Sequence, residues 1–245
     1  ARSEDAFETD NAPVPELTAP TTSVPPKSTR SLREARAALT DADVNTSDHG
    51  GNTGAGRVRR TSLSPDLRPF MDNATASELA FPARADRPWK YIVLHHSAHK
   101  EGSYEDIDRE HRKVLGYEGC GYHFVIGNGT GSGDGEIQVA QRWINQKHGV
   151  HCRNAKSSDI DEYGIGICLV GDFEQQKPTA RQIAATKALV TYLSDRYSIA
   201  DQKVETHNHL ASTPTVCPGK LFPSDSILSV PTSKPSTVNI DRAKP

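Results

Sequence analysis

The sequence predicts an α/β domain in which a central mixed β-sheet is flanked by helices, with a metal site at the rim of the sheet. Residues 91–94 are β-branched, aromatic or apolar without polar alternation, which is typical of a strand buried on both faces. Residues 180–197 carry apolar side chains at the spacing of a helix that covers a sheet. Strands and helices intermix without a strict βαβ repeat, which favours a mixed sheet.

Composition limits the class of protein. The chain has 245 residues, enough for one domain of ordinary size or two small ones, and its formal net charge is −2. Without an overall basic field we expect no nucleic-acid partner. No apolar run approaches the ~18 residues that a transmembrane helix needs, so we expect no such segment, and we expect a monomer. Residue 1 is Ala, so we expect a trimmed form from which any signal peptide is already gone.

The domain boundaries follow from shifts in composition. Residues 1–80 are rich in Pro, Ser, Thr and Ala and hold two aromatic residues, so they cannot bury enough apolar surface to offset chain entropy. We expect a disordered tail or tether there, with residues 70–81 packing on the edge of the domain. The folded domain is expected over residues 81–228, followed by a flexible tail over 229–245.

Local signals define the first half of the domain. Ser103 and Asp106 form a start signal for a helix that ends at Gly116. A second strand is expected over 122–126 and another over 136–139. The glycine-rich run between them superficially fits a dinucleotide-binding pattern, but that pattern must open a helix, whereas a strand follows here. We therefore expect a long hairpin loop.

The second half of the domain shows similar local signals. Residues 165–170 form a third buried strand, and Thr179 with Gln182 makes a capping box for the helix over 180–197. A short last strand is expected over 204–206. A loop from 207 to 218 and a helical turn near 221–227 complete the domain.

Histidines and a cysteine suggest a metal site. His95 and His96 end a buried strand, where ligand sites of α/β proteins usually lie, but they point to opposite faces and cannot both enter one cleft. His209 and Cys217 lie in a loop whose prolines exclude a helix. His95, His209 and Cys217 would leave one position of a tetrahedral zinc shell for water, which is the catalytic arrangement. From the residues alone, His96, His111 or His207 could replace a member of this set.

Four blocks, taken together and in order, resemble a known family: I-V-L-H-H-S-A over 92–98, G-Y-H-F-V-I over 121–126, G-I-G-I-C-L-V-G over 164–171, and His209 through T-P-T-V-C-P-G over 213–219. Residues 89–222 resemble the family of peptidoglycan recognition proteins and zinc N-acetylmuramoyl-L-alanine amidases, which includes phage amidase lysozymes. The resemblance implies one zinc ion per chain, held by His95, His209 and Cys217.

The resemblance also implies roles for residues around the metal. Tyr122 matches the catalytic tyrosine, although a core aromatic on a strand is the other interpretation. Thr215 matches a position where members carry a catalytic Lys or Thr, and a simple turn residue beside Pro214 is an equal alternative. One branch of the family has a glutamate base where Cys168 stands, so the proton acceptor stays open; a small buried hydrophobe is the favoured interpretation of Cys168.

The substrate-binding set is expected to comprise His151, His96 and Asn154. His151 resembles a histidine of the family's substrate groove, and a surface-loop histidine is its alternative interpretation. The expected reaction is hydrolysis of the amide between N-acetylmuramic acid and L-alanine of peptidoglycan or a muropeptide. Such a substrate implies an exported protein, placed in the periplasm, the cell envelope or outside the cell.

Two other functions stay open from the sequence. A non-catalytic peptidoglycan-binding receptor could use the same fold, but family members of that kind lose the cysteine ligand, whereas Cys217 is present. A zinc-stabilised domain without a glycan ligand would want a fourth protein ligand, for which His207 is the candidate.

A disulfide between Cys120 and Cys152 is the last expectation. With Cys217 assigned to zinc and Cys168 to a buried strand, these two cysteines are left, and both lie in loops. Cys120 is close in sequence to Tyr122 and Cys152 follows His151, so a shared groove would bring them together. Two free thiols are the alternative.

Overall fold

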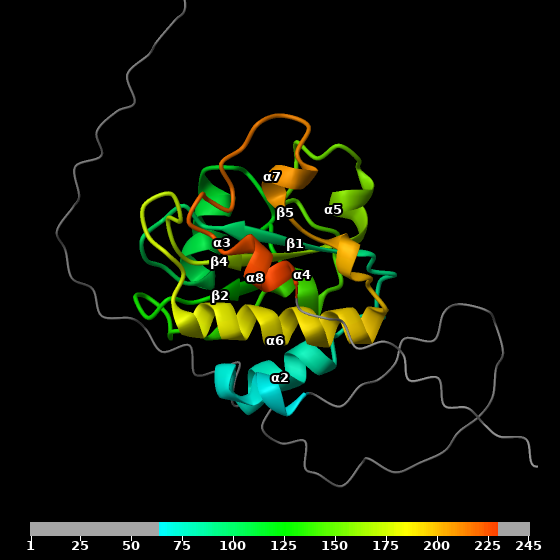
Figure 1. The fold of residues 1–245 in the computed structure, drawn as a ribbon. Coiled ribbons are helices and arrows are strands. Elements are labelled where there is room, and N and C mark those ends of the chain that lie inside the picture. Colours follow the sequence, from blue (N-terminus) through cyan, green and yellow to red (C-terminus); the bar gives the residue numbers. More distant parts are fainter. Residues whose placement is uncertain (1–63, 230–245) are drawn as a thin grey trace, which may run out of the picture. The chain divides into compact units, whose positions relative to one another are not determined.

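The computed structural model describes residues 64–229, which form a five-stranded sheet with helices on both faces (Figure 1). The strand order is β3-β2-β4-β1-β5, and all neighbouring pairs are parallel except β2 with β3. This arrangement confirms the expected mixed sheet. The elements are η1 Pro65–Phe70, α2 Asn73–Ala80, β1 Tyr91–His96, α3 Tyr104–Lys113, β2 Phe124–Ile126, β3 Ile137–Val139, α4 Gln141–Ile144, α5 Asp159–Tyr163, β4 Gly164–Leu169, α6 Ala180–Tyr197, η2 Asp201–Lys203, β5 Val204–Thr206, α7 His207–Leu210 and α8 Ser224–Leu228.

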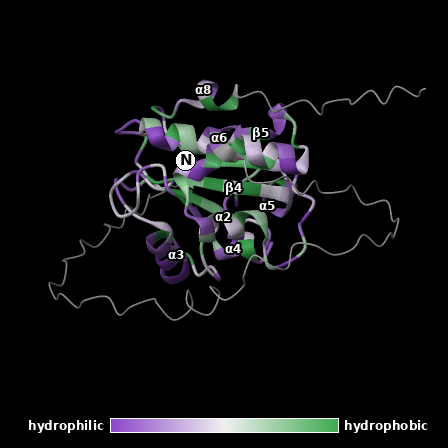
Figure 2. Cartoon of the chain, turned by 90° about the horizontal axis from the view of Figure 1, so that it is seen from below, coloured by the Kyte–Doolittle hydropathy of each residue, from purple (hydrophilic) through white to green (hydrophobic). Residues whose placement is uncertain are grey.

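The two central strands, β1 and β4, separate two different environments. Alternate side chains such as Ile92, Leu94 and Ile167 belong to the main hydrophobic core. Their neighbours Val93 and Cys168 face the other side, where they pack in two smaller clusters. Figure 2 shows the strands at the centre, β4 among them, in green, and the outer helix α3 in purple. The sheet therefore has one predominantly apolar face and one face that is only partly apolar.

Helix α6 covers the apolar face, as expected (Figure 1). Thr179 and Gln182 form the predicted capping box at its start. The buried Gln182 amide donates to the carbonyl oxygens of Ile126 (3.1 Å) and Val170 (2.8 Å), so it satisfies backbone groups at the ends of β2 and β4. The helix is therefore fixed to the sheet by hydrogen bonds as well as by apolar burial.

The packed region begins earlier than the expected boundary at residue 81. Leu67 of η1 and Leu79 of α2 are fully buried in the main core. Trp143 Nε1 donates to the carbonyl oxygen of Leu79 at 3.2 Å, and Arg196 Nη1 donates to that of Ala80 at 2.9 Å. Residues 64–80 thus belong to the fold: the packing expected over 70–81 is present, and it extends back to η1, where a tail had been expected. Two isolated leucines in a polar stretch were too weak a signal.

The strands β2 and β3 form the predicted antiparallel hairpin, and the glycine run is its loop. Strand β2 starts at Phe124 rather than at 122. The reason is His123, whose Nδ1 accepts the Gly166 N–H at 2.9 Å, the bond that a backbone carbonyl would otherwise take. His123 Nε2 donates to the Lys147 carbonyl oxygen at 3.0 Å, so this fully buried histidine has a structural role. In the described part of the chain, no helix is both long and apolar enough to cross a membrane.

Replacing Leu79 by Ala tests whether α2 is part of the folded unit. Removal of this fully buried side chain is expected to lower the free energy of unfolding by ~2–5 kcal/mol, measured by urea denaturation. The matched control is Leu115→Ala, because Leu115 is 47% exposed and its loss should change stability by less than ~0.5 kcal/mol. Equal stabilities for the two variants would contradict the assignment of α2 to the core.

Candidate metal centre

The register of the parallel strands brings side chains that can bind a metal ion into one row. His95 on β1 pairs with Cys168 on β4, which pairs with Val125 on β2. On the other side of β1, Leu94 pairs with Thr206, the last residue of β5. The next residue after Thr206 is His207, which lies beside His95, the next residue after Leu94. Both side chains point to the face of the sheet away from α6. The row lies at the carboxyl ends of the parallel strands, where α/β proteins place their sites.

His95, His207 and Cys217 converge at this row. One ligand atom from each lies within 4.8 Å of the others. His95 Nδ1 is 3.7 Å from Cys217 Sγ, and the His95 and His207 ring centroids are 4.8 Å apart. His95 is fully buried, and burial together with the neighbouring histidines lowers its pKa well below the usual value. The imidazole is therefore neutral at physiological pH, which is the form that binds metal ions.

Asn154 sets the orientation of His207. The Asn154 amide nitrogen donates to Thr213 Oγ1 at 3.0 Å, so its Oδ1 faces His207 Nε2 at 2.8 Å as an acceptor. His207 Nε2 therefore carries the ring hydrogen, and the lone pair of Nδ1 is left for the site. Asn154 thus supports a side chain of the centre, and its contact with substrate stays a prediction.

The donor set fits zinc. Two imidazole nitrogens and one thiolate are its preferred ligands, and nitrogen and sulfur ligands of one tetrahedral zinc ion stand about 3.6 Å apart. The observed separation of His95 Nδ1 and Cys217 Sγ, 3.7 Å, agrees with this value. Burial raises the pKa of the Cys217 thiol to about 12, partly offset by the His96 backbone N–H. The thiol therefore needs a bound cation to lose its proton at neutral pH.

His209, the expected second histidine, lies outside the group of three. It is two residues beyond His207 on α7, so its side chain points ~200° away around the helix axis. Its side chain is 59% exposed, and its Nδ1 is 3.0 Å from Glu205 Oε2. The structure brings His207 to His95 and Cys217 instead. Applying the strand-end argument used for His95 to the strand over 204–206 would have indicated His207.

His96 lies on the opposite face of the sheet. Its Nδ1 accepts the Phe173 backbone N–H at 3.3 Å, and its ring is buried with its centroid 5.9 Å from that of Phe173. The alternation of strand side chains accounts for this position. His96 therefore lies apart from the group of His95, His207 and Cys217, and its contact with substrate stays a prediction.

Tyr122 and Thr215 lie next to the centre. The Tyr122 ring centroid is 5.0 Å from that of His95. Burial, and then the nearby sulfurs of Cys168 and Cys217, raise the pKa of the Tyr122 phenol well above its usual value, so the hydroxyl keeps its hydrogen and can donate it. Thr215 Oγ1 accepts the Cys217 backbone N–H at 3.3 Å, which leaves the hydrogen of its hydroxyl free.

His151 is buried beneath His95 rather than exposed in a groove. Its side chain has no exposed surface, and its Nδ1 is 3.1 Å from His95 Nε2. Neither the groove interpretation nor the surface-loop interpretation fits this position, because no part of the ring reaches solvent. Asp161 fixes the backbone of the loop that carries His151. Its Oδ1 accepts the backbone N–H groups of His151 (3.0 Å) and Cys152 (2.9 Å).

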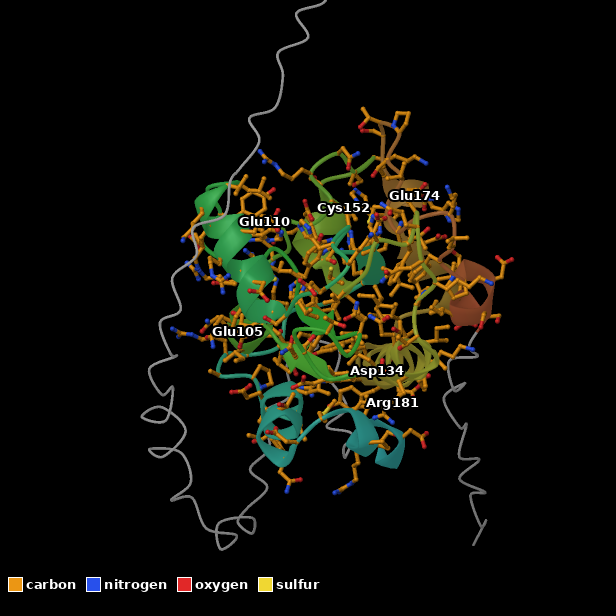
Figure 3. The ribbon with its side chains drawn as sticks, turned by 90° about the vertical axis from the view of Figure 1, so that its left-hand side faces the viewer. Glu105, Glu110, Asp134, Cys152, Glu174 and Arg181 are labelled. Carbon is orange, nitrogen blue, oxygen red and sulfur yellow. The ribbon has the colours of Figure 1, made fainter. Side chains whose placement is uncertain are left out.

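The four cysteines are all buried free thiols, so the expected bridge between Cys120 and Cys152 is not formed. Cys120 packs in the cluster of Cys168, and Cys152 packs in the separate cluster of Val93. In Figure 3, Cys152 lies across the sheet from Arg181, which belongs to α6. The backbones beside the two cysteines do meet, since Val150 N donates to the Gly121 carbonyl oxygen at 3.3 Å, but the side chains of Cys120 and Cys152 pack in different clusters.

A pair of histidine variants separates the two candidate ligands. His207→Ala is expected to weaken zinc binding by at least ~10²-fold because a direct ligand is lost, whereas His209→Ala should bind zinc as tightly as the unmodified chain. Dissociation constants are measured by competition with a chromophoric chelator. The reverse order of the two variants would restore His209 as the ligand.

The folded domain is similar to known proteins. The model of the N-acetylmuramoyl-L-alanine amidase family matches residues 85–220. Peptidoglycan-recognition protein 2 of Holotrichia diomphalia is 29% identical over 123 residues, which are 47% of this chain and 59% of that protein. Peptidoglycan-recognition protein SC2 of Drosophila melanogaster is 29% identical over 140 residues, 53% of this chain and 67% of that protein.

Among solved structures, the amidase LysC from Clostridium intestinale is 27% identical, with a TM-score of 0.48, and the match covers 59% of this chain and 88% of that one. The chain spans less than two thirds of the length of the Holotrichia diomphalia relative. The family model, however, matches more than half of the chain. The chain therefore belongs to the family of N-acetylmuramoyl-L-alanine amidases and peptidoglycan recognition proteins.

Proposed function

We propose that the chain is a zinc-dependent amidase that hydrolyses the bond between N-acetylmuramic acid and L-alanine in peptidoglycan. The observation that carries the proposal is the convergence of His95, His207 and Cys217 within 4.8 Å, beside Tyr122. Three protein ligands leave one of four tetrahedral positions for water, which is typical of catalytic zinc sites. A zinc-stabilised domain is less well supported, because the groups found among the described residues hold three members each, not four.

The chain's own residues supply the rest of the chemistry. Zinc, when bound, lowers the pKa of a water molecule to ~7 and polarises the substrate carbonyl. Tyr122 donates a hydrogen bond to the oxyanion that develops as the amide is attacked, and the Thr215 hydroxyl has a hydrogen for the same purpose. Asn154 holds His207 so that its Nδ1 faces the centre.

Cys168 does not serve as the proton acceptor. It occupies the place of a glutamate base found in one branch of the family, and it is fully buried. Burial raises the pKa of its thiol well above the usual value, so it stays protonated at neutral pH and cannot take a proton from water. We propose that the acceptor comes from elsewhere around the open face of the centre.

The partner of this site is peptidoglycan or a muropeptide, and one zinc ion binds per chain. Because peptidoglycan lies in the cell wall, the proposed reaction takes place outside the cytoplasm. The main alternative is a receptor that binds peptidoglycan without cleaving it. The presence of Cys217 in the group of three supports the enzyme, since a receptor does not need a complete ligand set.

Metal removal tests the proposal. Purified peptidoglycan is incubated with the zinc-loaded chain and with chain freed of metal by a chelator, and released stem peptides with a free L-alanine amino group are detected by mass spectrometry. We expect release only with zinc, and none from Cys217→Ser, because a serine hydroxyl stays protonated and is a poor zinc ligand. His209→Ala is the control with unchanged turnover. Binding without release would favour the receptor, and full turnover after verified metal removal would exclude the proposed mechanism.

Tyr122→Phe tests the role of the hydroxyl. The ring keeps its contacts with His95 and His111, so stability and zinc affinity should change little. Loss of a donor to the oxyanion should lower kcat by ~10²-fold or more. A variant with unchanged kcat would assign Tyr122 to the core alone.

A further inference from the structure

We propose that His151 is a positioning residue that fixes His95 for metal binding through a relay of two hydrogen bonds. In this relay His95 Nε2 donates to His151 Nδ1, at 3.1 Å, and His151 Nε2 donates to the Gly164 carbonyl oxygen, at 3.2 Å. The inference rests on the proposed zinc centre and adds to it a residue that touches neither metal nor substrate.

The direction of each hydrogen follows from the end of the relay. A carbonyl oxygen can only accept, so His151 Nε2 must carry the hydrogen that points at Gly164. A neutral imidazole has one N–H, so His151 Nδ1 is then an acceptor and the hydrogen between the two rings belongs to His95 Nε2. The lone pair of His95 therefore lies on Nδ1, the nitrogen 3.7 Å from Cys217 Sγ.

Such a support is what a histidine ligand requires. Metal-binding histidines usually donate their second ring N–H to a carboxylate, a backbone carbonyl or water, which fixes the tautomer and the ring plane. No carboxylate or carbonyl oxygen is described as a partner of His95 Nε2; the described partner is His151. His151 thus extends the link from His95 to a backbone carbonyl of β4.

The ring of His151 is held in one position by steric contact. A Cβ atom added at Gly149 or at Gly166 would come within 2.4 Å of His151 Cδ2, so both positions must lack a side chain for the ring to fit. Gly166 lies on β4, where it pairs with Val93. Asp161 fixes the loop backbone from the other end by accepting the His151 backbone N–H at 3.0 Å.

Another interpretation of the same atoms makes His151 itself a ligand. His95, His151 and Cys152 form a second group whose ligand atoms lie within 4.8 Å of one another. An ion there would replace the hydrogen bond between the two rings and would depend on Cys152. The relay requires no contribution from Cys152, so a Cys152 variant separates the two interpretations.

The first experiment compares zinc dissociation constants of the full chain by chelator competition. His151→Leu should weaken binding by ~10–100-fold, the usual cost of losing such a support. In His151→Asn, the amide oxygen can still accept from His95 Nε2, so affinity should lie within a few-fold of the unmodified chain. Cys152→Ala should not change it. Equal affinities for His151→Leu and the unmodified chain would overturn the relay, and so would a loss in Cys152→Ala as large as that in His151→Leu.

The second experiment reads the tautomer directly. Nitrogen-15 NMR of the histidine side chains in the unmodified chain should show His95 protonated on Nε2 and unprotonated on Nδ1, in the zinc-free and zinc-loaded states alike. A hydrogen on Nδ1 in the zinc-free chain would exclude the relay, even if His151→Leu did not fold. If the unmodified chain bound no zinc, the proposed function would fail while the tautomer still decided the inference.

Discussion

The parallel pairing of β1 with β4 and β5 is the constraint on which the candidate centre depends. Its register carries His95, Cys168 and His207 to one edge and one face of the sheet. A shift of one residue in either pairing would turn these side chains toward α6 and bring apolar side chains to the site. The main core, which packs against the other face, opposes such a shift, because it would have to exchange buried apolar side chains for polar ones. The packing of the hydrophobic core thus determines which polar groups meet.

Burying so many polar rings on one face has an energetic cost that the structure offsets with hydrogen bonds. His123, His151 and His207 each have a partner for a ring nitrogen within the chain, a carbonyl oxygen or an amide oxygen in every case. These partners select neutral tautomers, since a buried imidazolium without a paired anion would be unfavourable. The polar face is therefore ordered by the same rule that governs any protein interior.

Much of the fold could be predicted from the sequence, because strong local patterns decide it. The run of apolar residues in β1, the capping box of α6 and the hairpin of β2 and β3 were all predictable from period and capping alone. The packing of residues 64–80 was not, because two buried leucines only acquire a partner surface once α6 and the sheet exist. Local sequence patterns predict individual helices and strands, whereas the packing of one helix against another or against the sheet depends on the three-dimensional structure.

The candidate site was predictable in part for the same reason. His95 and Cys217 followed from a strand end, a loop and a family resemblance, whereas the choice between His207 and His209 depended on the register of β5 and the direction of one helical turn. The inward position of His151 depended on two glycines that have no side chain to fill its place. The thiols of Cys120 and Cys152 were expected to meet because their neighbours do. The neighbouring backbones are indeed hydrogen-bonded, but the two thiols pack in separate clusters and stay free, and no local pattern indicates in which cluster a side chain packs.

The loop that carries Cys217 is joined to the rest of the domain by polar contacts at its edges. Ala211 bridges to Ala155, Ser212 N donates to the Asn154 carbonyl oxygen at 2.6 Å, and Asn208 N donates to the Cys217 carbonyl oxygen at 3.0 Å. A cation held by two residues at strand ends and one in this loop would bind the folded chain and not the unfolded one. The melting temperature would then rise with free zinc concentration, by mass action. In zinc-poor surroundings the chain would lose thermal resistance together with its ligand, so the supply of zinc would set its lifetime as well as its chemistry.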